Sequence, residues 1–526
     1  MKTVARMASF VHDILSRAEL RPAAASIVRS VLGGITATGS VVLSEILRPQ
    51  VDGKKELRAA EQRVSHALKN DATFDQLPDA YRDLLAPVAH SMPYRSVDGS
   101  DLSKPASRKT EFLDVIRDGS AKPRTRLAVG PQGVLPASSV PWSATRSKKG
   151  KGRRRRPAQA KPRTKKPAAG RRRTTRPATP ASRPQRPRTP ARKAERATRK
   201  AERQAARAAV GEASPPAPSA VPPRAEGATK TGRVKFPSPP ALKKLGYWMV
   251  QIVVSDGKGN QLPVAQDLFS TQDPSYQALG EEAWTKTFQL SIERVIKDVG
   301  RGGCWQMDRG FDDIVWMNWM SKRVDQYNLR LKGNRRVRPG TKEAAPLPVE
   351  TFAETLAARH KMPIRYVDKR SHKEKSRIIS FTWAPIWIDG VDHPQYLIVA
   401  HTGRKHPLLV VTNKRPENAE EAAASITAYL ERWGNEEMTR ACKQLTGLER
   451  IRVRSMAALR RMMWLAMIAV GLQALSILTC GRLTRATLDR AKEFIKTVRL
   501  VLYRIWRVVQ GDILRALERR SPVLLS

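Results

Sequence analysis

The chain has 526 residues, of which 97 are Lys or Arg and 48 are Asp or Glu, so its formal net charge at pH 7 is +49. A surplus of this size indicates a polyanionic partner, above all nucleic acid. The three cysteines lie far apart without a CxxC spacing, which excludes a disulfide-stapled scaffold and predicts free thiols in a reducing compartment. The N-terminal segment is amphipathic and contains acids, so no secretory signal is expected there.

Residues 1–90 are expected to be helical, because apolar residues recur there at spacings of three and four. Two roles stay open for this region: a helical cap on the next domain, or a module that binds DNA ends. Over residues 91–120 the pattern changes to short extended runs. The first run ends at Asp98, and the second ends at the turn RDGS.

Residues 121–240 are of low complexity and rich in Pro, Ala and Arg. Residues 146–207, the basic arm, contain 26 Lys or Arg and two acids, so the arm carries a net charge of +24. Such a segment buries too little apolar surface to offset chain entropy, and it is expected to be disordered. We expect the arm to bind phosphates regardless of sequence. A solvated linker and an insertion without a role are the alternatives.

Regular patterns resume at residue 246 with an expected hairpin, whose turn lies at Asp256–Asn260. A helix is expected next, then a short strand that ends at Asp308, a second helix and another strand. Residues 363–412 read mostly as strands, and helices follow from residue 418. One mixed sheet flanked by helices, an α/β (α+β) fold, is the simplest packing of these elements.

Residues 462–480 contain no charged side chain, and a run of about 19 residues is long enough to span a bilayer. Gln473 interrupts this run, and a helical pattern that contains two arginines leads into it. A core helix of a large domain is therefore the favoured interpretation. A membrane span is the alternative.

Polar side chains recur near residue 430 at spacings that suit one face of a helix. Four residues follow one another at steps of three, four and seven: Tyr429, Arg432, Glu436 and Lys443. On a helix their side chains lie within about 60° of one another. Together with Asp98 and Asp308 after two expected strands, Glu436 completes a set of three carboxylates. Carboxylates are the ligands of divalent metal ions that act on phosphodiesters.

Alternatives to these assignments stay open. Asp101 competes with the first acid, and Glu437 competes with the third. Asp308 has the alternative role of capping the end of its strand. Arg432 has the alternative role of a simple i,i+4 partner of Glu436.

Four blocks of this sequence resemble the DDE transposases of bacterial insertion sequences, in the branch that carries a Tyr–Arg–Glu–Lys signature. The blocks are residues 97–120, 246–254, 307–313 and 426–455. The last block, which contains YLERWGNEEMTRACKQL, is the most specific. The resemblance implies an RNase H-like core, a bacterial cytoplasmic and nucleoid-associated location, and a homodimer that acts on double-stranded DNA. The DNA comprises terminal inverted repeats and target DNA.

Composition and the resemblance together divide the chain into regions. In order they are a helical region that binds DNA ends (1–90), the start of the catalytic core (91–120), the disordered basic insertion (121–240), the core with the second acid (241–345), a β-rich insert (346–415), the core helices with the glutamate (416–480) and a helical dimerisation region (481–526).

Site roles follow residue by residue. Three residues match the catalytic acids of the family: Asp98, Asp308 and Glu436. They are expected to bind Mg²⁺, with Mn²⁺ as a substitute. The residues expected to contact DNA near the scissile phosphate are Tyr429, Arg432, Lys443 and Arg330.

This chain departs from the family pattern in two places. Residues 121–240 intrude between blocks that the family joins almost directly. Some relatives also place a tryptophan that stacks on a flipped base where this chain has about Leu408. Trp383 and Trp387 are the candidates to replace it.

Two rival interpretations remain from the sequence. One is a noncatalytic protein that compacts DNA through the basic arm and is tethered to a membrane by residues 462–480. The other is a decayed transposase, in which the three acids persist but the insertion spoils the fold.

Overall fold

The computed structural model describes residues 2–104, 110–116, 244–367, 374–403 and 406–479, with Trp506 and residues 509–513. The expected basic insertion (121–240) lies outside the described residues. So does most of the expected dimerisation region (481–526). The described residues all belong to one compact unit, Met1–Thr125 with Pro240–Ser526.

The N-terminal region consists of helices. They are α1 (Lys2–Arg17), α2 (Pro22–Thr38), α3 (Leu43–Leu47), η1 (Arg48–Gln50), α4 (Lys54–Asn70), η2 (Ala72–Gln76) and α5 (Leu77–His90). Local sequence sets the ends of α2, because Pro22 starts the helix and Gly39 closes it in a left-handed conformation with φ +63°. The apolar faces of these helices belong to the main hydrophobic core.

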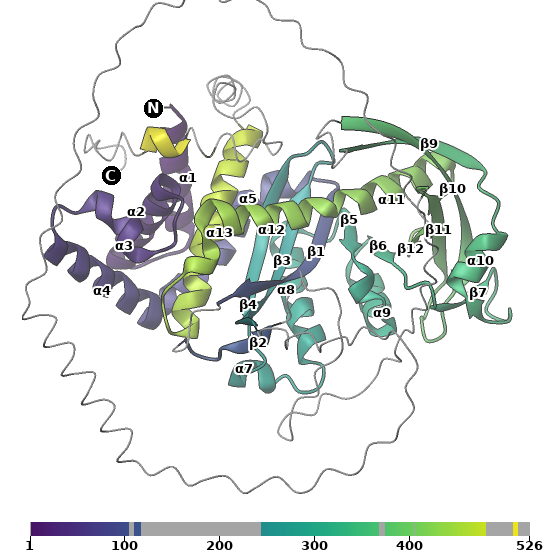
Figure 1. Cartoon of the computed structure of the whole chain (residues 1–526), viewed down its shortest axis with the longest axis horizontal. Coiled ribbons are helices and arrows are strands. Elements are labelled where there is room, and N and C mark those ends of the chain that lie inside the picture. The colour runs from purple at the N-terminus through teal and green to yellow at the C-terminus, as the bar shows by residue number, and fades with distance from the viewer. Residues whose placement is uncertain are drawn as a thin grey trace, which may run out of the picture. The chain divides into compact units, whose positions relative to one another are not determined.

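Five strands form the centre of the sheet in the order β4-β3-β1-β5-β6 (Figure 1). They are β1 (Tyr94–Ser103), β3 (Lys244–Ser255), β4 (Gln261–Phe269), β5 (Cys304–Met307) and β6 (Gln326–Arg330). β1, β3 and β4 pair antiparallel, whereas β5 and β6 run parallel to β1. The expectation of a mixed sheet flanked by helices is therefore confirmed.

β1 does not end at Asp98, as the sequence pattern suggested, but continues to Ser103. The reason is that β3 remains paired along the whole strand, down to Gly246 opposite Ser103. On its other side, β1 pairs with β5 only as far as Ser96. Asp98 thus lies within a strand, just past the point where its parallel neighbour stops.

A short strand, β2 (Asp114–Ile116), also pairs antiparallel with β3, and this pair places Ile116 opposite Lys244. These residues flank the stretch 117–243, which includes the basic insertion. The two described ends of the insertion are therefore adjacent in the sheet. Loop-closure entropy grows slowly with length, so a long insertion between neighbouring strands disturbs the core little.

The β-rich region extends the same sheet. Its elements are β7 (Arg336–Pro339), β8 (Leu347–Pro348), α10 (Val349–Thr355), β9 (His360–Val367), β10 (Glu374–Trp387), β11 (Gln395–His401) and β12 (Leu408–Thr412). β12 pairs antiparallel with β6, so the extension continues the core sheet. A second hydrophobic cluster packs these strands against α11 (Ala419–Glu431).

Helices cover both faces of the central strands (Figure 1). The remaining helices are α7 (Pro274–Gln277), α8 (Ala283–Val299), η3 (Arg309–Phe311), α9 (Ile314–Arg323), α12 (Trp433–Thr446), η4 (Leu448–Arg450) and α13 (Met456–Thr479). α8 lies on one face, since a Cβ at Gly99 of β1 would meet Phe288 at 3.1 Å. α12 lies on the opposite face, where its Thr439 donates a hydrogen bond to Gln251 of β3.

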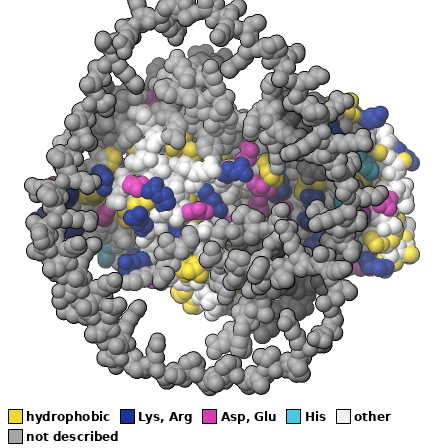
Figure 2. All heavy atoms as spheres, in the orientation of Figure 1, with side chains coloured by type: hydrophobic (Ala, Val, Ile, Leu, Met, Phe, Trp, Pro, Cys, Tyr) yellow, Lys and Arg dark blue, Asp and Glu magenta, His cyan; other side chains and the backbone are white. Residues whose placement is uncertain are grey.

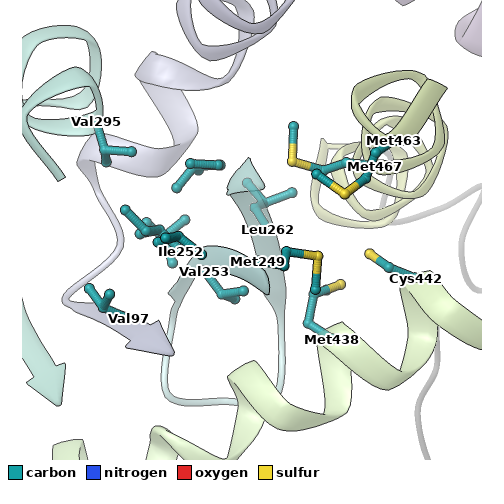
Figure 3. Packing of buried hydrophobic residues seen from close by; sticks show 14 of the residues in the cluster. Val97, Met249, Ile252, Val253, Leu262, Val295, Met438, Cys442, Met463 and Met467 are labelled. Atoms are coloured by element: carbon teal, nitrogen blue, oxygen red, sulfur yellow. The ribbon is translucent and has the colours of Figure 1, made fainter. Parts of the chain in front are cut away.

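α13 is the helix that contains most of the uncharged run 462–480. Among the described residues, α13 is long and apolar enough to cross a membrane. The bent helix pair Pro22–Thr38 and Leu43–Gln50 would pass the same test if the two helices formed one span. In α13, 78% of the most apolar 18-residue stretch is buried inside the protein. Figure 3 shows Met463 and Met467 of α13 beside Met438 of α12 and Met249 of β3. This is the packing of a core helix.

We predict that Gly471→Ala destabilises the protein. A Cβ at Gly471 in α13 would overlap the hydroxyl of Tyr81, which is fully buried and donates a hydrogen bond to the Pro263 carbonyl. Overpacking of this kind costs about 1–3 kcal/mol, which exceeds the gain in helix propensity. The free energy of unfolding from urea denaturation of the full chain measures the effect.

Gly33→Ala in α2 is the matched control, because no atom lies within 4 Å of a Cβ built there. It should leave stability unchanged or raise it by about 0.5–1 kcal/mol. Equal effects of the two substitutions would contradict the close packing of α5 on α13.

Candidate active site

The parallel pairing of β1 with β5 brings two of the predicted acids together. Ser96 lies opposite Gln306, and Asp98 and Asp308 each follow two residues later. Asp308 is still extended, with φ −79° and ψ 180°. Side chains two residues apart in an extended chain share a face, and paired strands lie about 4.8 Å apart. Both carboxylates therefore start from neighbouring positions on the face that α12 covers.

Helix α12 is fixed on this face by buried polar groups. Asn435 Nδ2 donates hydrogen bonds to the carbonyls of Ser96 (2.8 Å) and Gln251 (3.2 Å). One turn further on, Thr439 Oγ1 donates to Gln251 Oε1 (2.5 Å). Since Glu436 follows Asn435 directly, these contacts set the position of the third acid over β1.

Arg432 joins two of the acids. Its Nη1 lies 3.4 Å from Asp98 Oδ2, and its Nη2 lies 3.2 Å from Glu436 Oε1. The three side chains are 12%, 19% and 33% exposed for Arg432, Asp98 and Glu436 respectively. The i,i+4 pair that sequence spacing offered as an alternative is present, but the same guanidinium also holds the acid from β1.

The helix expected over the signature is interrupted at Arg432. α11 ends at Glu431 and α12 begins at Trp433. Around Arg432 the backbone forms i,i+3 hydrogen bonds, from the Arg432 N–H to Tyr429 O and from the Asn435 N–H to Arg432 O. Arg432 thus lies at the junction, with Tyr429 in α11 and with Glu436 and Lys443 in α12.

Asp308 has a structural contact as well as a place beside the other acids. Its Oδ1 accepts a hydrogen bond from the Gly310 N–H (2.6 Å), so the alternative role as a cap is present. The other acids of the same run have separate roles. Asp312 is buried and pairs with Arg335 at 2.7 Å, and Asp313 caps α9 by accepting from the Val315 N–H.

Burial raises the pKa of Asp98 from 3.8 to about 7, although the Arg432 guanidinium acts to lower it. The neighbouring carboxylates of Asp308 and Glu436 raise the pKa of Asp98 further, because like charges disfavour ionisation. This mutual influence places all three predicted acids in one electrostatic cluster. Perturbed carboxyl groups of this kind concentrate at functional sites.

The predicted DNA contacts lie around this cluster in different ways. The pairing of β5 with β6 ends at Met307 opposite Leu329, so Arg330 comes next to Asp308 on the neighbouring strand. The Tyr429 ring is buried, and the Arg432 guanidinium carbon lies 5.8 Å from its centre.

Lys443 is engaged elsewhere. Its Nζ contacts the Asp101 carbonyl and lies 3.7 Å from Asp101 Oδ1 and 3.8 Å from Glu449 Oε1. Asp101, the alternative first acid, thus contacts Lys443, whereas Asp98 contacts Arg432.

The donor set of this cluster suits a hard divalent cation, because all three side chains present carboxylate oxygens. Within the described ranges, however, no group of three or more His, Cys, Asp or Glu residues is arranged to hold a metal ion. The guanidinium of Arg432 lies against one oxygen of each of two of these acids. The chemistry of the residues fits Mg²⁺, and Arg432 stands as the cation among them.

Of the tryptophans considered for base stacking, Trp383 in β10 stacks on His360 with ring centres 4.9 Å apart. Trp387 carries Lys342 5.6 Å above its ring. Leu408 lies in β12, where it is part of the second hydrophobic cluster. Both tryptophans thus have partners within the β-rich extension.

Sequence reasoning missed the buried amides that position α12, namely Asn435 and Gln251. No spacing marks them, because each acts through a contact between elements far apart in the chain. The one signal available in the sequence was that Asn435, a polar residue, lies next to Glu436 on the buried side of an expected helix.

A comparison of the chain with models of known protein families finds no match, and a comparison with curated proteins finds none either.

We predict that Asp98→Asn removes a pH-dependent loss of stability. Between pH 4 and 7 the unfolded chain has released the Asp98 proton, whereas the folded protein, with the raised pKa, retains it. Stability contributed by this group is therefore complete below pH 4 and is lost as the pH rises through 7. In EDTA, the free energy of unfolding of Asp98→Asn minus that of the wild type should rise between pH 4 and 7 and level off above pH 7. A difference that does not change with pH would contradict the raised pKa.

Proposed function

We propose that the chain is a DDE transposase, which binds transposon ends and cleaves and joins DNA strands by two-metal-ion phosphodiester chemistry. The observation that carries the proposal is the single cluster of Asp98, Asp308 and Glu436 around one guanidinium. The acids come from two parallel strands and a helix that are far apart in the sequence. Their residue types are those required for this chemistry.

The strand order supports an RNase H-like core. Three antiparallel strands, β1, β3 and β4, are followed by β5 and β6 on the other side of β1 and parallel to it. The first and second acids lie on β1 and directly after β5, and the third lies on a helix that packs over them. The β-rich extension comes before the final acid, as the resemblance implies.

In this proposal Asp98, Asp308 and Glu436 hold a pair of Mg²⁺ ions. When bound, such ions lower the pKa of the attacking water and neutralise charge on the phosphate and the leaving 3′ oxygen. The described residues contribute position and exclusion of water. Asp98 interacts electrostatically with both other acids, and its burial lowers the local dielectric, which strengthens each of these contacts.

DNA binding is assigned to residues at two distances from the cluster. The proposal assigns phosphate contacts beside the scissile bond to Arg330 and Arg432, which lie near the acids. On the face seen in Figure 2, the described acidic and basic side chains are interspersed. About half of the chain's positive surplus lies in the basic arm, which carries +24 of +49. The arm is therefore the proposed source of nonspecific affinity.

The noncatalytic, membrane-tethered alternative is weakened by one observation. The helix that would be the tether, α13, is buried against α12 and β4, as Figure 3 shows for Met463 and Met467. The decayed-transposase alternative requires the insertion to spoil the fold. The direct pairing of Ile116 with Lys244 argues against such damage.

We predict that Asp308→Asn abolishes metal-dependent cleavage of supercoiled plasmid DNA by the full chain. Loss of a metal ligand removes several kcal/mol of transition-state stabilisation, or about 10³-fold in rate. Mn²⁺ is the metal in the assay, and the rate of nicking is measured on agarose gels.

Asp313→Asn is the matched control from the same sequence run. Asp313 caps α9 and is exposed, and Asn serves as well at this position. The control should cleave at the rate of the wild type. Equal rates for all three proteins would exclude the acid cluster as the catalytic site.

We predict that deletion of residues 146–207 flattens the salt dependence of nonspecific DNA binding. The log–log slope is about 0.9 per phosphate neutralised, so a loss of many phosphate contacts changes it markedly. Fluorescence anisotropy with a random-sequence duplex at several salt concentrations measures the slope. Unchanged slopes would show that the arm does not bind DNA. The preference for particular DNA ends should survive, because phosphate contacts carry no base readout.

A further inference from the structure

The guanidinium of Arg432 occupies oxygen atoms that metal ions would use. Asp98 Oδ2 and Glu436 Oε1 each lie within 3.4 Å of its terminal nitrogens. A carboxylate oxygen that is bound to a guanidinium is less available to a cation, and two cations at one place repel each other. Metal binding at these acids therefore requires Arg432 to move.

Arg432 also stabilises the cluster without metal. Its two terminal nitrogens lie against one oxygen of each of two acids, so its positive charge offsets the repulsion between these carboxylates. The guanidinium is itself only 12% exposed, and its Nε is buried without a hydrogen-bond partner in the described part of the chain. Its bonding capacity is thus incompletely used in this position, so the arrangement can be exchanged for a better one.

A phosphate offers Arg432 such an arrangement. Guanidinium and phosphate form paired, charge-assisted hydrogen bonds, and arginine is the side chain best suited to them. Arg432 sits at the junction of α11 and α12, beside the exposed Trp433, which is half open to solvent. The side chain begins at this junction and has a long stem with several rotatable bonds.

We propose, on the basis of the proposed function, that Arg432 is an internal counter-ion that couples metal binding to DNA binding. In the free protein it fills the acid cluster and weakens the affinity for metal. A DNA phosphate draws the guanidinium away, and the freed carboxylates then bind metal more tightly. By linkage, metal must tighten the binding of DNA by the same factor.

This coupling has a functional consequence. A chain with a net charge of +49 binds DNA of any sequence, and a permanently loaded metal site would expose that DNA to cleavage. With Arg432 in the cluster, the metal site is completed only when a phosphate lies close to the acids. Nonspecific binding through the basic arm alone does not release the guanidinium.

Direct measurement of Mn²⁺ binding tests the inference without reliance on activity. Free Mn²⁺ is measured by electron paramagnetic resonance in titrations of the full chain, first without DNA. Arg432→Gln should bind Mn²⁺ more tightly than the wild type, by about tenfold, within the usual range of coupling between sites. Arg432→Lys should fall between the two, because a single ammonium cannot bridge both acids with a planar fork.

Arg440→Gln is the matched control for charge. It removes one positive charge from the same helix, at an exposed position to which no role is assigned. Its affinity for Mn²⁺ should match that of the wild type. Equal tightening in Arg432→Gln and Arg440→Gln would show a general effect of charge and would overturn the inference.

The second set of Mn²⁺ titrations is carried out with a saturating pool of random-sequence duplexes. DNA should raise the Mn²⁺ affinity of the wild type, and it should raise that of Arg432→Gln much less. If DNA has no effect on the wild type, the coupling is refuted.

The same titrations separate this inference from the proposed function. If wild-type Mn²⁺ binding is absent, or persists unchanged in Asp308→Asn, the proposed function fails. If the wild type binds Mn²⁺ through Asp308 but Arg432→Gln binds it no more tightly, the inference alone fails. Thermal unfolding in EDTA confirms that each variant is folded, and Arg432→Lys provides the test if Arg432→Gln is not.

Discussion

The contact of one guanidinium with two carboxylates from distant parts of the chain is the interaction on which this account depends. Asp98 comes from the centre of the sheet and Glu436 from the helix laid across it, and Arg432 binds both. Like charges brought together under a helix repel unless a cation offsets them. Arg432 is the cation that lies at this place, so its contacts link the packing of α12 on the sheet to the proposed chemistry.

Positioning of the acids rests on pairing rather than on local sequence. The parallel register of β1 with β5 brings Asp98 level with Asp308, and the Asn435 contacts with Ser96 and Gln251 hold the helix that carries the third acid. The long insertion leaves this frame unaltered, because it departs from strands that are hydrogen-bonded to each other. A basic segment can thus be added to the core while the distances between the acids are retained.

Much of the fold follows from the period of apolar residues, and the hairpin at β3 and β4, the helix α8 and the strands β5 and β6 were expected for that reason. The strand end predicted at Asp98 was wrong because tertiary pairing decides it: β1 continues to Ser103, since β3 stays paired with it. The pairing of β12 with β6, which joins the β-rich extension to the core sheet, has no signal in the sequence. The break at Arg432 was not expected, because the spacing of the signature residues suits one continuous helix. The signature spacing predicted that Glu436 lies beside Arg432, whereas the contact of Arg432 with Asp98 needed the fold.

The central claim is that Asp98, Asp308 and Glu436 together form a metal site that opens when DNA binds. Anomalous diffraction at the manganese edge, from crystals of the full chain with Mn²⁺ and duplex DNA, tests it most directly. The account predicts anomalous peaks in contact with all three carboxylates, with the Arg432 guanidinium on a phosphate and away from Asp98. Manganese bound elsewhere, or a guanidinium that still bridges Asp98 and Glu436 beside bound metal, would contradict it.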